Sequence, residues 1–96
     1  MRFELIIPPE IEREIAEEFD SFDNVETALA FIHDLDVLFE RIVERPLQFP
    51  VIYTSMRRAL LRRHDYSVFF ELDAKRSRAV IHCVIHQSRD PARWPR

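Results

Sequence analysis

The sequence predicts an α+β fold in the order βααβββ, with a helical hairpin packed on a mostly antiparallel sheet. Three observations lead to this prediction. A short extended run ended by two prolines opens the chain. Two stretches with the apolar spacing of amphipathic helices follow it. Three β-rich runs then fill most of the second half.

The first strand is expected at residues 2–7, because Pro8 and Pro9 disfavour helix in the residues before them and suit the first turn of a helix after them. The first helix is expected from residue 10 to about residue 21. Its apolar residues recur at spacings of four, four and three and form one stripe, with acidic residues and Arg13 opposite. The stripe consists of Ile11, Ile15, Phe19 and Phe22.

A second helix is expected to begin near Asp23, which with Glu26 three residues later resembles a capping box, while Asn24 is an alternative cap. Pro46 and Pro50 end it. The short polar turn between the helices indicates an antiparallel hairpin. The expected buried stripe consists of Val25, Ala28, Leu29, Ile32, Leu35, Phe39 and Ile42.

The three remaining strands are expected at residues 56–63, 66–72 and 78–86. The last is almost continuously apolar, which predicts burial on both faces, and residues 73–77 read as a hairpin loop.

The chain contains no glycine, so turn positions that need a positive φ are expected at Asn or Asp, such as Asp23, Asn24 or Asp73. The absence of glycine also excludes the Gly-rich loops that cradle phosphates.

Residues 1–96 are expected to form one domain, because the chain is short and its 47% hydrophobic and 32% charged residues match a soluble globular protein rather than a disordered one. No run is apolar enough for a signal peptide or a membrane span, which predicts a cytoplasmic protein. The single cysteine, Cys83, fits a reducing compartment and is interpreted as a small core residue.

Charge is divided unevenly along the chain. Residues 1–50 carry 4 Lys/Arg and 13 Asp/Glu, and residues 51–96 carry 10 and 4, which gives −9 against +6. Such asymmetry suggests a polyanion or an acidic partner for the basic half. The alternative is that acidic helices simply cover a basic sheet.

His82 and His86 have the spacing of a metal-binding pair on a helix, but on a strand they lie about 13 Å apart, too far to share one ion. We therefore expect no metal and no cofactor. His82 is interpreted as a structural histidine. His86 stands at the end of its strand, where it could reach solvent and exchange a proton.

Arginines form the most informative polar pattern. On an extended strand, Arg58 and Arg62 point to one face while Arg57 and Arg63 point to the other. If this strand lies near the last one, the arginines of both segments form a patch that suits phosphates or carboxylates. The alternative is pairing with the acidic helices. The arginines after the last strand are Arg89, Arg93 and Arg96.

The final residues contain two further features. Asp90-Pro91 should end the strand, because proline cannot donate to a ladder, and Asp90 is interpreted as structural. Trp94 either packs to hold the tail or anchors an interface. No Ser-His-Asp set with a recognisable spacing is present.

The segments "RRALLRRHDYSVFFEL" and "VIHCVIHQSRDPARW" resemble the RelE/ParE toxin superfamily of bacterial type II toxin-antitoxin modules, particularly its ParE-like branch. The shared pattern is an Arg-rich strand, a "PY" strand and a last strand that ends in His-x-x-Arg-Asp-Pro. It covers about the last 40 residues closely, and the βααβββ order extends the resemblance to the whole chain. Asp65 replaces the usual proline before Tyr66.

The resemblance implies a growth-inhibiting toxin that a cognate antitoxin wraps and neutralises, in a complex of the two proteins. A ParE-like toxin would bind DNA gyrase, and the expected contact residues are Arg58, Arg62, Arg89, Arg93 and Trp94.

A RelE-like toxin would instead cleave messenger RNA in the ribosome, with His86 and Arg89 as catalytic residues. Two features argue against the nuclease. Ser67 stands where these nucleases carry arginine, and a terminal catalytic tyrosine or histidine is missing. A third possibility is an inactive homologue that only binds antitoxin.

Overall fold

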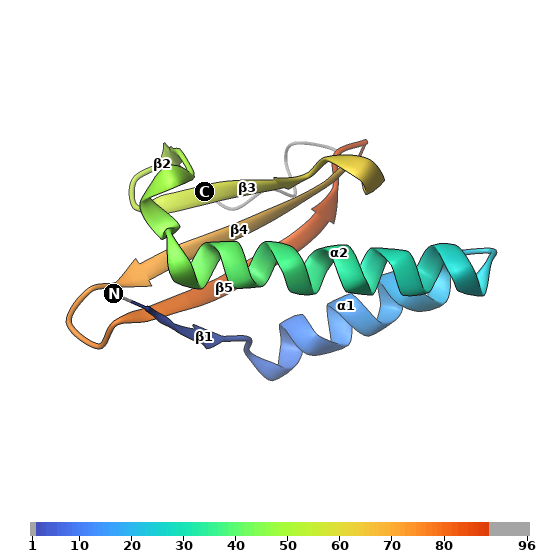
Figure 1. Ribbon diagram of the computed structural model, residues 1–96, viewed down its shortest axis with the longest axis horizontal. Coiled ribbons are helices and arrows are strands. Elements are labelled where there is room, and N and C mark those ends of the chain that lie inside the picture. Colours follow the sequence, from blue (N-terminus) through green and yellow to red (C-terminus); the bar gives the residue numbers. More distant parts are fainter. Residues whose placement is uncertain (1, 89–96) are drawn as a thin grey trace.

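The structure is a computed structural model that describes residues 2–88, and it confirms the α+β architecture (Figure 1). Two helices lie on one face of a five-stranded sheet, whose strand order is β1-β5-β4-β3-β2. β1 runs parallel to β5, and the other neighbouring strands are antiparallel. The elements are β1 (Glu4–Ile6), α1 (Pro9–Ser21), α2 (Val25–Glu44), the 3₁₀ helix η1 (Pro46–Gln48), β2 (Val51–Tyr53), β3 (Met56–Leu61), the 3₁₀ helix η2 (Arg62–His64), β4 (Tyr66–Asp73) and β5 (Arg78–His86).

Each helix begins at a residue suited to a helix N-terminus, a proline for α1 and an asparagine cap for α2. Pro9 opens α1, where the missing proline N–H costs no intrahelical bond. Asn24 caps α2, because its side chain accepts a hydrogen bond from the backbone N–H of Thr27 over 3.2 Å. Of the two caps considered for this helix, the structure uses Asn24 rather than a capping box at Asp23.

The core lies between α2 and the helix-covered face of the sheet. Phe31, Phe70 and Ile81 are fully buried within it. The buried stripe of α2 differs from the expected one, because Phe31 and Leu38 are buried whereas Val25 and Leu29 are 71% and 56% exposed. Residues 28, 31, 35, 38 and 42 also have helical spacing, so α2 carries two overlapping apolar stripes and contact with the sheet selects between them.

Two carboxylates of α1 fasten the helical hairpin to the sheet. β1 pairs with β5 only as far as Val80. Farther along β5, Glu14 accepts a hydrogen bond from the backbone N–H of Val84 over 2.9 Å. Glu18 is buried on the same helix and accepts a hydrogen bond from the Tyr66 hydroxyl. The α1 side chains therefore satisfy polar groups of the sheet where β1 has ended.

Positive φ falls on one aspartate, the residue type expected in a chain without glycine, but also on a threonine and a serine. Among the described residues, positive φ occurs at Thr54, Asp65 and Ser77, with values of 47°, 58° and 52°. The prediction was therefore wrong for Asp23, Asn24 and Asp73. Asp73 instead holds its turn with its side chain, which accepts from the backbone N–H of Arg76.

The middle of the chain contains more structure than the sequence indicated. The short strand β2 and both 3₁₀ helices were not expected, and β3 ends at Leu61 rather than at residue 63. Arg62 and Arg63 therefore belong to η2, so the strand alternation predicted for them does not apply. Within residues 2–88, no helix combines the length and the apolar character needed to cross a bilayer.

Candidate interaction surface

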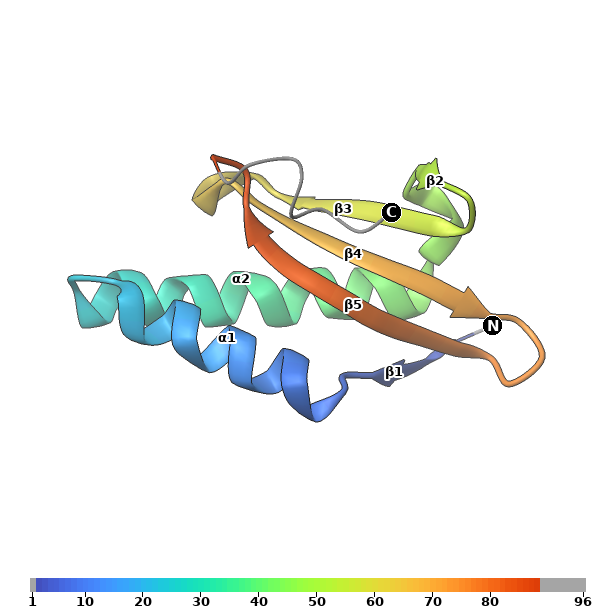
Figure 2. The ribbon, with the colours of Figure 1, turned by 180° about the vertical axis from the view of Figure 1, so that it is seen from behind.

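One end of the sheet brings His86 close to the segment that contains Arg62. Leu61, Tyr66 and His86 lie in one row across β3, β4 and β5. The backbone N–H of Gln87 donates to the carbonyl of Asp65 over 2.7 Å, which joins the segment after β5 to the segment after η2. β4 separates the two strands that were expected to be near, but the segments that follow them come together at this end of the sheet (Figure 2). Arg89, Arg93 and Trp94 lie outside the described residues.

Arg57 and Arg58 extend to opposite sides of β3, as strand alternation predicts. Arg57 lies on the helix-covered side, where its Nη1 donates to the backbone carbonyl of Phe49 over 2.6 Å. Arg58 lies on the helix-free side, where its Nε donates to the Oγ of Ser67 over 2.9 Å. Ser67 is fully buried, so this hydrogen bond directs the Arg58 guanidinium along the helix-free face.

His86 is partly exposed at the end of β5, but one of its ring nitrogens is already engaged. The backbone N–H of Ser88 lies 3.1 Å from Nδ1, and the Ser88 hydroxyl oxygen lies 2.6 Å from the same atom. A backbone N–H can only donate, so Nδ1 accepts and the neutral ring carries its proton on Nε2. In this arrangement the acceptor nitrogen of the neutral ring is engaged by Ser88. The Tyr66 ring packs edge-on against the imidazole at 5.0 Å.

His82 forms part of a polar cluster on the sheet. Its Nε2 lies 2.8 Å from Glu71 Oε1, and the Ser55 hydroxyl donates to the other oxygen of the same carboxylate. The carboxylate stands between serine and histidine, whereas activation of a serine nucleophile needs the histidine in the middle. The structural interpretation of His82 therefore agrees with its contacts. Within residues 2–88, no group of three or more His, Cys, Asp or Glu side chains could hold a metal ion.

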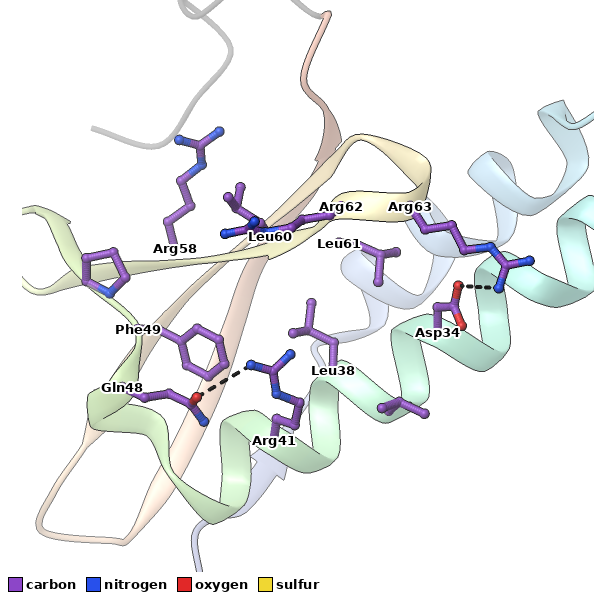
Figure 3. Close-up of a pocket in the computed structure, with 12 residues that line it drawn as sticks. Asp34, Leu38, Arg41, Gln48, Phe49, Arg58, Leu60, Leu61, Arg62 and Arg63 are labelled. Atoms are coloured by element: carbon purple, nitrogen blue, oxygen red, sulfur yellow. Dashed lines mark hydrogen bonds and ion pairs between the residues drawn. The ribbon is translucent and has the colours of Figure 1, made fainter.

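A groove of about 450 Å³ runs along α2 and the outer edge of β3 (Figure 3). Its floor is apolar and consists of buried side chains, chiefly Leu38, Phe49 and Leu61. Val37 adds a half-exposed apolar side chain from α2. Charged side chains surround this floor, and those that line the groove are Asp34, Arg41, Arg58, Arg62 and Arg63.

Four arginines and one aspartate therefore line the groove, in a chain whose net charge is −3. Asp34 is already engaged, because its Oδ2 atom lies 3.6 Å from Arg63 Nη1 and 2.9 Å from His64 Nε2. The guanidinium carbon of Arg41 lies 5.6 Å from the centroid of the Phe49 ring, and its Nη2 donates a hydrogen bond to Gln48 Oε1. Arg62 is exposed and makes no ion pair with any residue in the described part of the chain. The groove is locally basic, so it suits an anionic occupant.

Sequence reasoning found Arg58 and Arg62 but missed Arg41, Phe49 and the Asp34–His64 pair. Asp34, Val37, Leu38 and Arg41 have the spacing i, i+3, i+4 and i+7, which places them on one helical face. That spacing could have indicated a mixed polar and apolar surface. It could not indicate that β3 would lie beside it, because that contact depends on the tertiary fold.

Comparisons of the chain with known proteins assign it to no family. No family model matches the chain, and no curated protein matches it either. The candidate surface consists of the helix-free face at Arg58, the sheet end at His86 and the basic groove beside β3.

Proposed function

We propose that this protein is the ParE-like toxin of a type II toxin-antitoxin module. It acts in the cytoplasm, inhibits growth by binding DNA gyrase, and is neutralised by a cognate antitoxin that forms a complex with it. The helix-free face around Arg58, the exposed Arg62 and the segment with Arg89, Arg93 and Trp94 contact the target.

The observation that supports this proposal is the position of the sequence motifs within the fold. The Arg-rich segment, the tyrosine segment and the segment ending in His86 form three adjacent strands, β3, β4 and β5. Arg58 extends on the face without helices, and β5 ends at His86, at the end of the sheet where Arg62 also lies. A partner approaching this end meets guanidinium groups suited to bidentate capture of carboxylates or phosphates.

The ribonuclease alternative is less well supported by the described side chains. Attack by a ribose 2′-hydroxyl needs a proton acceptor and stabilisation of the developing charge. Tyr66 is buried, and its hydroxyl donates to Glu18. Ser67 is fully buried and bonded to Arg58, and His86 Nδ1 accepts from Ser88. Gyrase binding requires no such chemistry, which is why we prefer it.

A DNA supercoiling assay with purified gyrase tests the proposal. The protein is first separated from any antitoxin by denaturation and refolding. We expect it to inhibit supercoiling, and we expect Arg58→Ala and Arg89→Ala to weaken that inhibition. Arg76→Ala is the matched control, because Arg76 lies in the loop at the opposite end of β4, where it forms a local ion pair with Asp73. An excess of wild-type protein that leaves supercoiling unchanged contradicts gyrase as the target.

Two further measurements separate the alternatives. Primer extension on translated messages after induction reveals new cleavage ends if the protein is a ribosome-dependent nuclease. Overexpression of soluble protein without any growth defect indicates an inactive homologue that only binds antitoxin.

A further inference from the structure

The 3₁₀ helix η2 is too short to hold its own conformation. Its backbone hydrogen bond joins the N–H of Asp65 to the carbonyl of Arg62 over 3.3 Å, and Leu61 before it has no polar side chain that could cap it. Short 3₁₀ turns also have poor hydrogen-bond geometry. The exposed side chain of Arg62 therefore takes its direction from the tertiary contacts of η2 rather than from η2 itself.

His64 supplies such a contact, since it is the one residue in the segment 62–65 that is not exposed. Its side chain is 7% exposed, and its Nε2 lies 2.9 Å from Oδ2 of Asp34 on α2. The ring meets Phe31 and Phe22 edge-on, with ring centroids 5.7 Å and 6.4 Å apart. One side chain thus combines burial, two ring contacts and a hydrogen bond to α2.

The hydrogen bond to Asp34 is stronger evidence of attachment than the neighbouring ion pair. The carboxylate can only accept, so His64 Nε2 carries the proton. A second proton on Nδ1 would leave this N–H in place, so the bond does not depend on the charge of the ring. Arg63 lies 3.6 Å from the same carboxylate oxygen, but its side chain is 73% exposed, and exposed ion pairs contribute little. His64 is therefore the residue that attaches η2 to α2.

The attachment extends from η2 to the end of β5. Asp65 follows His64, and its carbonyl accepts a hydrogen bond from the backbone N–H of Gln87 over 2.7 Å. Asp65 also has a positive φ of 58°, a conformation that a residue other than glycine keeps only where its surroundings hold it. A displacement of His64 would consequently move both Arg62 and the segment after β5.

We propose that His64 is a positioning residue, which holds η2 on α2 through its hydrogen bond to Asp34 and thereby fixes the direction of the Arg62 side chain. Its part in target binding rests on the proposed function, in which Arg62 contacts gyrase. His64 acts through Arg62 and need not touch the target. Loss of the hydrogen bond should therefore weaken gyrase inhibition only while Arg62 is present.

Amide hydrogen exchange of the full chain tests the attachment without gyrase. His64→Phe keeps an aromatic ring but lacks the donor, and we expect the Asp65 and Gln87 amides to exchange about tenfold faster. The Val68 amide in β4 should be unaffected, which shows that the sheet is intact. His33→Phe makes the same substitution on the exposed surface of α2 and should leave all three amides unaltered.

Two results of this experiment overturn the proposal. The first is unchanged exchange at Asp65 and Gln87 in the His64→Phe protein. The second is equally accelerated exchange at Val68, because that result means a loss of global stability rather than a local release of η2.

A double-mutant cycle in the supercoiling assay tests the connection to Arg62. His64→Phe should raise the half-inhibition concentration about fivefold in the wild-type background and less than about twofold in the Arg62→Ala background. A merely structural role of His64 would raise it equally in both backgrounds, and this result overturns the positioning role.

The outcomes for His64 and for gyrase are distinguishable. If the wild-type protein does not inhibit gyrase while His64→Phe accelerates exchange at Asp65 and Gln87, the attachment of η2 stands and gyrase is removed as the target. If the wild-type and His64→Phe proteins inhibit gyrase equally well, the proposed function stands and the positioning role is removed.

Discussion

The hydroxyl of Tyr66 on β4 donates a hydrogen bond of 2.5 Å to the Oε2 atom of Glu18 on α1. Both residues are buried, at 4% and 7% exposure. The Tyr66 ring also packs 4.8 Å from the Phe31 ring of α2, so one side chain joins both helices to the sheet. A carboxylate inside a small domain is tolerated only when hydrogen bonds replace its hydration, and Tyr66 supplies one of them.

Tyr66→Phe should lower the free energy of unfolding by about 1–3 kcal/mol, because it deletes a buried hydrogen bond to a carboxylate while keeping the ring. Chemical denaturation monitored by circular dichroism measures this change. Tyr53→Phe is the matched control, since Tyr53 is 50% exposed. Its effect should stay within about 0.5 kcal/mol. Equal effects of the two substitutions would refute the structural role of the hydroxyl.

A pair of leucines on α2 tests which stripe of this helix packs on the sheet. Leu38 is 2% exposed and Leu29 is 56% exposed. Leu38→Ala should cost about 2–5 kcal/mol of unfolding free energy through lost burial and a residual cavity. Leu29→Ala should change it by less than about 0.5 kcal/mol. If Leu29→Ala is the more damaging substitution, α2 is rotated relative to the arrangement described.

Glu14 offers a test of how α1 protects the edge of β5. Glu14→Ala removes the acceptor of the Val84 N–H and should cost about 1–3 kcal/mol. Glu14→Gln keeps an oxygen acceptor and should retain most of the stability. Amide hydrogen exchange at Val84 checks the mechanism, because exchange should accelerate in the alanine variant only. Glu17→Ala, on the exposed side of the same helix, should leave that amide unaffected.

The sequence was sufficient for the βααβββ order of the main elements, because their patterns are local. Apolar spacing and proline positions identified both helices, and the last strand was predicted at residues 78–86, where β5 lies. The short strand β2 has only three residues, and its pairing with β3 is a tertiary event that no alternation could indicate. The choice of Leu38 over Leu29 depends equally on the contact with the sheet.

The candidate surface was less predictable, because it combines residues from separate elements. Arg57 and Arg58 follow strand alternation, so the sequence predicted their opposite orientation. Arg62 and Arg63 do not, because η2 begins after Leu61 and removes the two-residue period. The groove also needs Arg41 and Phe49, which come from α2 and from the segment after it.

Ser67 provides a final test that connects the fold to the proposed function. Ser67 is fully buried, and its hydroxyl oxygen accepts one hydrogen bond from Arg58 Nε. Ser67→Ala should preserve the fold, because alanine fits the same space. It removes the hydrogen bond that orients the Arg58 guanidinium. If Arg58 contacts gyrase in this orientation, the concentration for half-inhibition of supercoiling should rise about fivefold, the equivalent of one net hydrogen bond of about 1 kcal/mol.

Arg58→Ala should raise the same half-inhibition concentration further, because it removes the contacting group itself. Ser88→Ala is the matched control, since it deletes a hydroxyl near His86 without touching Arg58. Circular dichroism must show that all three variants are folded. A Ser67→Ala protein that inhibits gyrase as well as wild type, beside a weakened Arg58→Ala protein, would mean that Arg58 acts without orientation by Ser67. If neither substitution weakens inhibition, gyrase does not contact the face around Arg58.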